Sequence, residues 1–427
     1  METAPVDAPE NIPSLRKKRL IIFFCAVILF FFTSMSKILV PGSVFSELKG
    51  ELGFSAGILA GMGSAYMYCY AASQLALGLL SSKYGGVRIL LFGGGCFVAG
   101  SLLFPLLSSP FWMIFARALT GLGAGTVFIA LAKLIDDLFP KNFSMTLGII
   151  LFIGYLGPVT GGLPFAALVE NTSWRIALLT PAVISFLAFT VVLIFLKGTV
   201  KKVLPGKTWK PLFVILSDKR SWLLYCTSSL IFGVYYVIMT VMGKKCLEDF
   251  GHFSSYAASL WITVFAVIVA VNNIISNVVL KFLKGRRRIL VIFAGFSCLL
   301  GSLFSAFAFH FSWGGWIVFG FLLISIPAGF FSIFGTVAKE LQKPELVGLA
   351  VAILNFFAFV AIALSGSVAG YVLSSYEGEL LAGAGGGLSY PPGAYRDLFI
   401  VFSILSLLGF TASLFIPETN PASAQKQ

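Results

Sequence analysis

The sequence predicts an all-α membrane protein with twelve transmembrane helices arranged in two six-helix halves. Of the 427 residues, 58% are hydrophobic and 11% are charged, and the mean hydropathy is +0.96. One water-soluble core could not bury that much apolar surface. The apolar residues also gather in repeated stretches that are long enough to cross a bilayer as helices. Helices are expected because each satisfies its backbone hydrogen bonds within the span.

Twelve apolar stretches follow one another at regular intervals along the chain. Each has the length that a helix needs to cross the hydrocarbon core. We expect the spans at residues 20–43, 57–81, 87–109, 112–138, 144–168, 175–196, 222–243, 256–281, 289–311, 314–338, 346–374 and 397–416. Because the number of crossings is even, both termini should lie on the same side of the membrane.

Polar segments outside the spans divide the chain into its parts. Residues 1–19 are polar and end in a basic run, and the long apolar run that follows does not resemble a cleaved signal peptide. The longest connection, 197–221, contains the Pro205–Gly206 break and a stretch that could form a short amphipathic helix on the inner leaflet. We therefore predict a cytoplasmic tail, an N-terminal half at 20–196, a cytoplasmic linker, a C-terminal half at 222–416 and a second tail at 417–427.

The positions of the basic residues predict the orientation. Of the 30 Lys and Arg residues, 23 lie in segments on the side of the N-terminus and 5 on the opposite side. Cytoplasmic loops carry such an excess of positive charge, so we expect both termini in the cytoplasm and the protein in a plasma (inner) membrane. The net charge of +13 is explained by this pattern, and we expect no nucleic-acid partner.

The connection between the second and third spans carries a recognisable motif. Gly78, Lys83, Gly85 and Arg88 occur at spacings that resemble the signature loop of the major facilitator superfamily. Ser82 stands where that loop usually has Asp, so the charged latch of the family would be missing here. Glycine permits a tight turn, and the basic pair should hold the loop inside. We expect a structural or gating role for these five residues.

Two further stretches resemble elements of the same superfamily. In the fourth span, Arg117 precedes glycines at 121, 123 and 125, a spacing that lets helix backbones approach closely. An arginine at that depth must find carbonyl groups or an anion, and we favour a structural role over substrate contact. In the fifth span, Gly157 and Pro158 belong to a glycine-rich element that should bend and pack the helix. The resemblance covers nearly the whole chain and implies a transporter.

A single charge interrupts the first span. Lys37 lies six residues before the expected end of that span, where a cation at the helix centre would cost at least about 2.5 kcal/mol. Two explanations remain open: the lysine meets an anionic substrate, or its stem reaches the interface and anchors the helix there. A base in the first helix and tyrosines in the second are similar to the organic-anion branch of the superfamily, its organophosphate antiporters and anion–cation symporters. That resemblance implies a small organic anion as substrate.

The predicted substrate site lies between the halves near the membrane midplane. Tyr66 and Tyr70 are four residues apart and share one face of the second helix, so they could join Lys37 in holding an anion. Each tyrosine could equally be a packing or interface residue. Amides could line the path or only link helices. The other substrate-binding candidates are Gln74, Tyr235, Tyr236, Asn272 and Asn355. The 44 Phe residues are expected to face lipid rather than to form a binding site.

The acidic residues bear on the energy source. All 17 fall in tails, loops or helix ends, and Asp136 and Asp137 come nearest to the hydrocarbon. Where the symporters of the anion branch carry a carboxylate beside the helix-one base, this chain has Ser36. A proton-coupled carrier normally keeps a titratable group inside the membrane. We therefore favour anion exchange or facilitated movement, with proton-coupled symport of a small carboxylate, sugar acid or amino acid as the alternative.

A function of another class also remains, that of a membrane receptor or scaffold that keeps the fold without transporting. An enzyme is not expected, because the sequence shows no nucleophile with a base, no metal-ligand cluster and no phosphate-binding loop. No cofactor or metal is expected for the same reasons. The expected partners are a small, anionic substrate and the lipid bilayer, and the protein should be a monomer.

Overall fold

The computed structural model describes residues 13–84, 86–139, 143–195, 210–310, 315–343, 346–382 and 388–419. Helices dominate these residues, and one pair of two-residue strands accompanies them. In chain order the elements are α1 (Pro13–Leu39), η1 (Gly42–Val44), α2 (Phe45–Leu52), α3 (Ala56–Tyr84), α4 (Gly86–Leu103), η2 (Phe104–Leu106), α5 (Pro110–Leu138), α6 (Phe143–Gly161), α7 (Leu163–Asn171), α8 (Trp174–Ile194), α9 (Lys210–Leu216), α10 (Lys219–Val237), η4 (Ile238–Met242), α11 (Gly243–Asp249), α12 (Ser255–Phe282), α13 (Arg287–His310), α14 (Trp316–Ala328), α15 (Phe331–Glu340), α16 (Val347–Ser375), η6 (Glu377–Glu379), β1 (Leu381–Ala382), β2 (Leu388–Ser389) and α17 (Pro392–Leu414).

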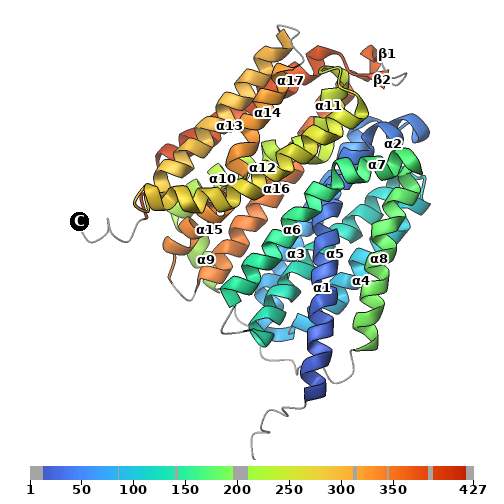
Figure 1. Cartoon of the computed structure of the whole chain (residues 1–427). Helices are drawn as coiled ribbons and strands as arrows, with labels where there is room; N and C mark the ends of the chain where they lie inside the picture. Colours follow the sequence, from blue (N-terminus) through green and yellow to red (C-terminus); the bar gives the residue numbers. More distant parts are fainter. Residues whose placement is uncertain are drawn as a thin grey trace, which may run out of the picture.

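The helices form two bundles that stand side by side. Figure 1 shows the blue-to-green helices α1 to α8, here called the N-half, beside the yellow-to-red helices α10 to α17, here called the C-half. The short elements α2, α7, α11, β1 and β2 gather at one end of the molecule, here called the capped end. The start of α1 lies away from that end. The predicted division into two halves is thus visible in the packing.

Ten helical segments of the described residues are long and apolar enough to cross a membrane. The bent pair α6 and α7 makes an eleventh if it counts as one span. A twelfth predicted span, 57–81, corresponds to α3, whose 29 residues would reach roughly 43 Å along the helix axis. Three tyrosines lie in the middle of α3. The structure is that of a predominantly helical integral membrane protein, and the count of twelve stays a prediction.

Prolines and glycines break two of the predicted spans. The fifth, predicted at 144–168, bends by 42° where α6 ends and α7 begins. Pro158 lies inside α6, and a proline near the start of α7 follows Gly162. Each proline lacks the N–H group that a continuous helix needs. The tenth span, predicted at 314–338, consists of two helices. The first, α14, ends just after Pro327, and the second, α15, begins at Phe331.

Two other differences concern the end of the seventh span and the connection between α16 and α17. The seventh span continues beyond residue 243, through the π-helical turn η4 into α11, and ends at Asp249. Between α16 and α17 the chain forms the antiparallel pair β1 and β2, which the sequence pattern did not reveal. In the linker, α9 confirms a short helix within the predicted stretch, while residues 196–209 and the tails at 1–12 and 420–427 lie outside the described residues.

Glycines allow the closest helix contacts of the N-half. A side chain at Gly121 of α5 would collide with the backbone of Tyr66 in α3. A Cβ atom at Gly157 of α6 would lie 2.6 Å from the backbone nitrogen of Met35 in α1. Real Cβ atoms do not approach backbone that closely, so these glycines set the distances between α3 and α5 and between α1 and α6. Those helices in turn carry the side chains of the candidate site.

Candidate functional site: a cavity between the halves

A cavity of about 130 Å³ lies between the two halves. Helices α1, α3, α5 and α6 line it from the N-half, and α10, α12, α14, α15 and α16 line it from the C-half. Its wall is mainly aromatic and aliphatic, with a few polar side chains: Ser34, Lys37, Tyr70, Tyr155, Tyr235, Tyr236 and Asn355. An apolar pocket with a small number of polar groups is the usual form of a small-molecule site.

Lys37 supplies the only charge among the described lining residues. Its Nζ atom lies 4.7 Å from the ring centre of Tyr70 and 5.2 Å from that of Phe359, so the N-half and the C-half each place an aromatic ring beside the ammonium. None of the ion pairs that can be described involves Lys37. Aromatic faces attract a cation but do not neutralise it. An anion entering the cavity would therefore meet an uncompensated positive charge.

Four of the other predicted residues line the same cavity. Tyr70 comes from α3, Tyr235 and Tyr236 come from α10, and Asn355 comes from α16. The Oδ1 atom of Asn355 is buried and has no hydrogen-bond partner among the described residues. Phenol O–H groups donate hydrogen bonds, and an amide both donates and accepts. The cavity can thus surround the charge of a ligand with polar groups from both halves.

Three predicted residues lie outside this lining. Tyr66 is completely buried, and its hydroxyl donates to the carbonyl oxygen of Thr33 at 2.9 Å. Gln74 donates from Nε2 to Gly125 O at 3.1 Å, which links α3 to α5. Asn272 donates from Nδ2 to Ile326 O at 3.3 Å, which links α12 to α14. Their polar groups therefore join helices, and their part in substrate binding stays a prediction without support from the cavity.

The predicted structural residues are spread through the N-half. Pro158 lines the cavity and Gly157 packs on α1. Arg117 is 3% exposed and donates to three oxygen atoms at the end of α1 and just beyond it: Ser36 Oγ at 3.1 Å, Ser36 O at 3.2 Å and Val40 O at 3.1 Å. These bonds connect α5 to the last turn of α1, the turn that carries Lys37.

Only part of the predicted signature loop can be described. The backbone of Gly78, Ser82 and Lys83 is helical at the end of α3, and Gly85 lies outside the described residues. Arg88 is half-buried in the first turn of α4. The gating role of this motif stays a prediction.

Sequence reasoning missed two groups of lining residues. Tyr155 of α6 lines the cavity, and its hydroxyl accepts a hydrogen bond of 3.0 Å from Asn273 of α12 across the two halves. The available signal was a phenol three residues before Pro158 in an otherwise apolar span. Five phenylalanines also form the wall, in contrast to the expectation that phenylalanine faces lipid: Phe30, Phe128, Phe232, Phe331 and Phe359.

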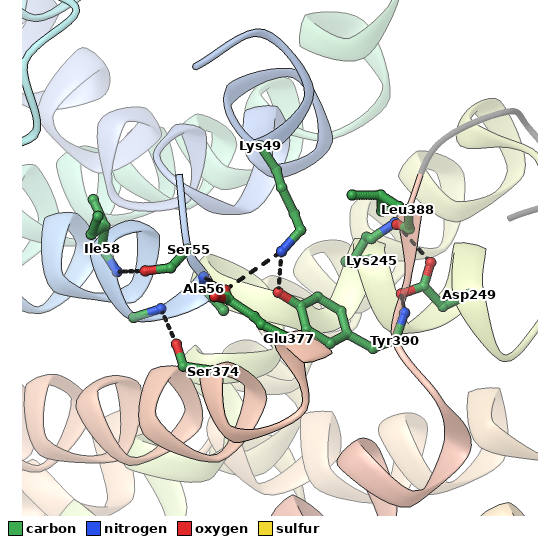
Figure 2. A network of polar contacts seen from close by, with 11 residues as sticks. Lys49, Ser55, Ala56, Ile58, Lys245, Asp249, Ser374, Glu377, Leu388 and Tyr390 are labelled. Carbon is green, nitrogen blue, oxygen red and sulfur yellow. Dashed lines mark hydrogen bonds and ion pairs between the residues drawn. The ribbon is translucent and has the colours of Figure 1, made fainter. Parts of the chain in front are cut away.

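Polar contacts at the capped end tie the two halves together. Figure 2 shows Lys49 of α2 pointing between Glu377 and Tyr390 of the C-half. Its Nζ atom donates to Tyr390 Oη at 2.6 Å and lies 3.6 Å from Glu377 Oε1, which also accepts from the backbone N–H of Ala56 at 2.6 Å. Burial lowers the pKa of Lys49, while the carboxylate of Glu377 opposes that shift.

Further contacts between the halves continue from the capped end toward the cavity. Ser46 of α2 donates to Glu248 Oε2 at 3.2 Å, and Ser64 of α3 donates to Ala363 O at 2.9 Å. The backbone N–H of Leu163 donates to Thr263 Oγ1 at 2.7 Å, which joins α7 to α12. This side of the cavity is therefore closed by direct bonds between the halves.

The chain is similar to proteins of one superfamily. A family model described as Major Facilitator Superfamily matches residues 22–252, more than half of the chain. The chain is 28% identical over 212 residues to "Efflux pump dotC" of Dothistroma septosporum, covering 44% of this chain and 34% of the pump. It is 31% identical over 130 residues to "Probable anion transporter 6, chloroplastic" of Arabidopsis thaliana, covering 30% of this chain and 25% of that protein. The matches thus span about a third or less of these relatives' own lengths.

Solved structures share the fold over almost the whole chain. The crystal structure of a D-xylose-proton symporter superposes with a TM-score of 0.71 at 14% identity, covering 94% of this chain and 98% of that one. At this identity the similarity establishes the common fold. The relatives named above are transporters or pumps, in agreement with the expectation that the chain is not an enzyme.

Proposed function

The chain belongs to the major facilitator superfamily, and from this premise we propose that it is a secondary transporter of a small organic anion. It works by anion exchange or facilitated movement through alternating access. One observation carries the proposal: the ammonium of Lys37 lies in the cavity between the halves, beside two aromatic rings and without a carboxylate partner among the described residues. A cation in that position is favoured by a negatively charged ligand, because charges attract more strongly in a poorly hydrated cavity than in water.

The composition of the wall supports a particular kind of anion. One lysine among the described lining residues matches one negative charge. The phenylalanine and tyrosine rings match an apolar, flat or branched body, since such rings bury apolar surface. Hydroxyl and amide groups of Tyr70, Tyr235 and Asn355 can hydrogen-bond the anionic group. The proposed substrate is therefore a monoanion with an apolar body, such as an aromatic or branched monocarboxylate.

The bonds at the capped end support alternating access. The halves are joined there through Lys49, Glu377 and Tyr390, so the cavity of this conformation is closed on that side. The distribution of Lys and Arg supports a capped end that faces outside, with both termini in the cytoplasm. The conformation is then one that is closed to the outside, and transport requires the capped-end bonds to break and reform.

Proton-coupled symport receives less support. The described residues that line the cavity include no Asp, Glu or His, and a proton that moves with a substrate needs a titratable group or the substrate itself as its carrier. Anion exchange needs no such proton carrier, because an anion is bound, and neutralises Lys37, while the carrier moves in either direction.

A binding and counterflow experiment tests the proposal. Proteoliposomes are screened with organic phosphates, sugar acids, amino acids and monocarboxylates, and each aromatic monocarboxylate is paired with the amide of the same shape. We expect a monocarboxylate to be transported and its neutral amide to be excluded. Lys37→Ala should abolish this transport, and Lys37→Arg should retain a part because the charge remains while the geometry changes.

The matched control is Lys219→Ala, which removes an exposed lysine at the start of α10 and should leave transport unchanged. Full transport by Lys37→Ala, with folding and expression like those of the wild-type protein, would return Lys37 to a membrane-anchoring role. Absence of counterflow for every class of solute would favour a receptor or scaffold.

A further inference from the structure

A second, smaller cavity lies wholly inside the N-half. Its volume is about 30 Å³, and α1, α4, η2, α5 and α8 line it. It shares no lining residue with the cavity between the halves. Three hydroxyl-bearing residues and one charged residue interrupt its apolar wall: Ser36, Ser101, Thr120 and Arg117. The small cavity is therefore a separate polar site that the proposed transport does not use.

Arg117 brings a buried positive charge to this small cavity. Its side chain is 3% exposed, and its hydrogen bonds go to three neutral oxygen atoms, two of Ser36 in α1 and one of Val40 directly after it. Its Cζ atom lies 4.3 Å from the ring centre of Tyr66, which attracts the cation without neutralising it. None of the ion pairs in the described part of the chain involves Arg117. A buried charge without a counter-ion is costly.

The groups at this site that can still form a hydrogen bond are donors. The Nε atom of Arg117 is buried and has no acceptor among the described residues. Ser36 Oγ accepts from Arg117, so its own O–H remains able to donate. The hydroxyl of Thr120 donates to Ala116 O at 2.7 Å and is thus committed to its own helix. A ligand that accepts hydrogen bonds and carries negative charge is complementary to this set.

The size of the small cavity selects among such ligands. A water molecule needs at least about 10–15 Å³ measured in this way, so a cavity of about 30 Å³ has room for one monatomic ion but not for an organic anion. We propose that the small cavity binds one chloride ion as the counter-ion of Arg117. The ion is held by the guanidinium and by the hydroxyls of Ser36 and Ser101, apart from the transported substrate.

Binding there should stabilise the folded N-half. The ion would contact residues of α1, α4 and α5 at once, and a ligand that binds only the folded state raises its stability by mass action. The melting temperature of the purified protein should therefore increase with the logarithm of chloride concentration once the site begins to fill. Bromide should act like chloride, and gluconate, which is too large for about 30 Å³, should not.

The experiment compares thermal unfolding of the purified full-length protein in chloride and in gluconate at equal ionic strength. Ser101→Val removes one donor and fills space in α4 without touching the bonds of Arg117 to α1. It should raise the chloride concentration needed for half of the stabilisation by about tenfold or more, as expected for a lost hydrogen bond to a charged group. Thr180→Ala removes a hydroxyl of α8 that bonds only its own helix, and should keep the wild-type response.

Lys37→Ala separates this site from the cavity between the halves, and should keep the chloride response in full. If Lys37→Ala instead lost the chloride response, chloride would be assigned to the larger cavity and the proposal would be overturned. A melting temperature that is equal in chloride and gluconate, or a chloride response unaltered by Ser101→Val, would show that the small cavity holds water at most. Anomalous scattering from bromide-soaked crystals at Arg117 would place the ion directly.

Discussion

Lys37 and Tyr70 line the cavity between the halves, whereas Tyr66 is buried beside it with its hydroxyl bonded to Thr33 O. A charge in an apolar span is costly, so the sequence alone marks Lys37 as a candidate, and the structure places it in the cavity wall. Tyr66 and Tyr70 share a helix face, yet only Tyr70 lines the cavity. The periodicity of α3 fixes which side chains point the same way, but it does not say that Arg117 and Thr33 already occupy the space around Tyr66. That depends on packing between helices.

The two tyrosines give a prediction that separates binding from stability. Tyr70→Phe should weaken binding of the anionic substrate by about tenfold or more, because a hydrogen bond to a charged group is lost. Tyr66→Phe should instead lower the free energy of unfolding by about 1 kcal/mol, because its hydroxyl donates to Thr33 O. Equilibrium binding and denaturant unfolding of both variants measure the two effects. Weaker binding by Tyr66→Phe with unaltered stability would contradict the assignment.

At the scale of elements, the sequence located the helices well and their breaks poorly. The length of the apolar stretches and the charged loops between them predict the spans, because each of these features lies within a single segment of the chain. The 42° bend between α6 and α7 depends on Gly162 and on the contact of Leu163 with Thr263 of the other half. The β1 and β2 pair joins only two residues from each strand, which is too short for a pattern of alternation to reveal.

Helix contacts made by glycine should be sensitive to a single methyl group. Gly157→Ala places a Cβ atom 2.6 Å from Met35 N and 2.8 Å from Phe31 O, so α1 and α6 must separate. We expect a loss of about 1–3 kcal/mol in the free energy of unfolding, as in other overpacked interiors. Gly61→Ala is the matched control, because the nearest atom to its Cβ is a flexible isoleucine methyl at 3.9 Å. Similar stability of the two variants in detergent would refute this role of Gly157.

The short helix α2 should make closure of the capped end depend on pH. Burial raises the pKa of Glu47, as do the nearby Glu248 and Glu170, whereas Lys244 lowers it. Opening of the capped end would hydrate Glu47 and return its pKa toward 4.5, the ordinary value. The closed form then binds the proton at higher pH than the open form. Acidification from neutral pH toward 4.5 should therefore favour the closed form.

Spin labels at residues 50 and 378, on exposed glycines of the two halves, measure that equilibrium in a background without the native cysteines. The distribution of distances should shift toward the short, closed distances on acidification. Glu47→Gln should resemble the acidic state at every pH because it mimics the protonated side chain. A shift toward longer distances on acidification would show that Glu47 does not govern this closure.

For the whole molecule, the arrangement of two halves around a central cavity connects fold to function. The halves could be anticipated because the sequence predicts six apolar spans on each side of a polar linker. The cavity itself could not, because its wall combines side chains from nine helices whose relative positions depend on long-range packing. Lys37 lies where the halves meet, so under the proposed alternating access its charge would take part in each change between the two open sides.

That charge leads to the central claim, that the carrier reorients readily only with an anion bound. Moving an unneutralised lysine through the closed intermediate should cost at least about 2.5 kcal/mol more than moving a neutral pair. Exchange should therefore exceed net uptake by roughly seventyfold or more.

The most direct test measures uptake of the labelled anion into proteoliposomes that contain either the same anion or buffer alone. The account predicts much faster uptake when the anion is present on both sides, and no accumulation of a fully ionised anion when only a pH gradient is imposed. Equal rates with and without internal anion, together with uphill accumulation driven by the pH gradient alone, would contradict it. Protons would then be moving with the substrate, and Asp136 and Asp137 of α5 would become the groups to examine as their carriers.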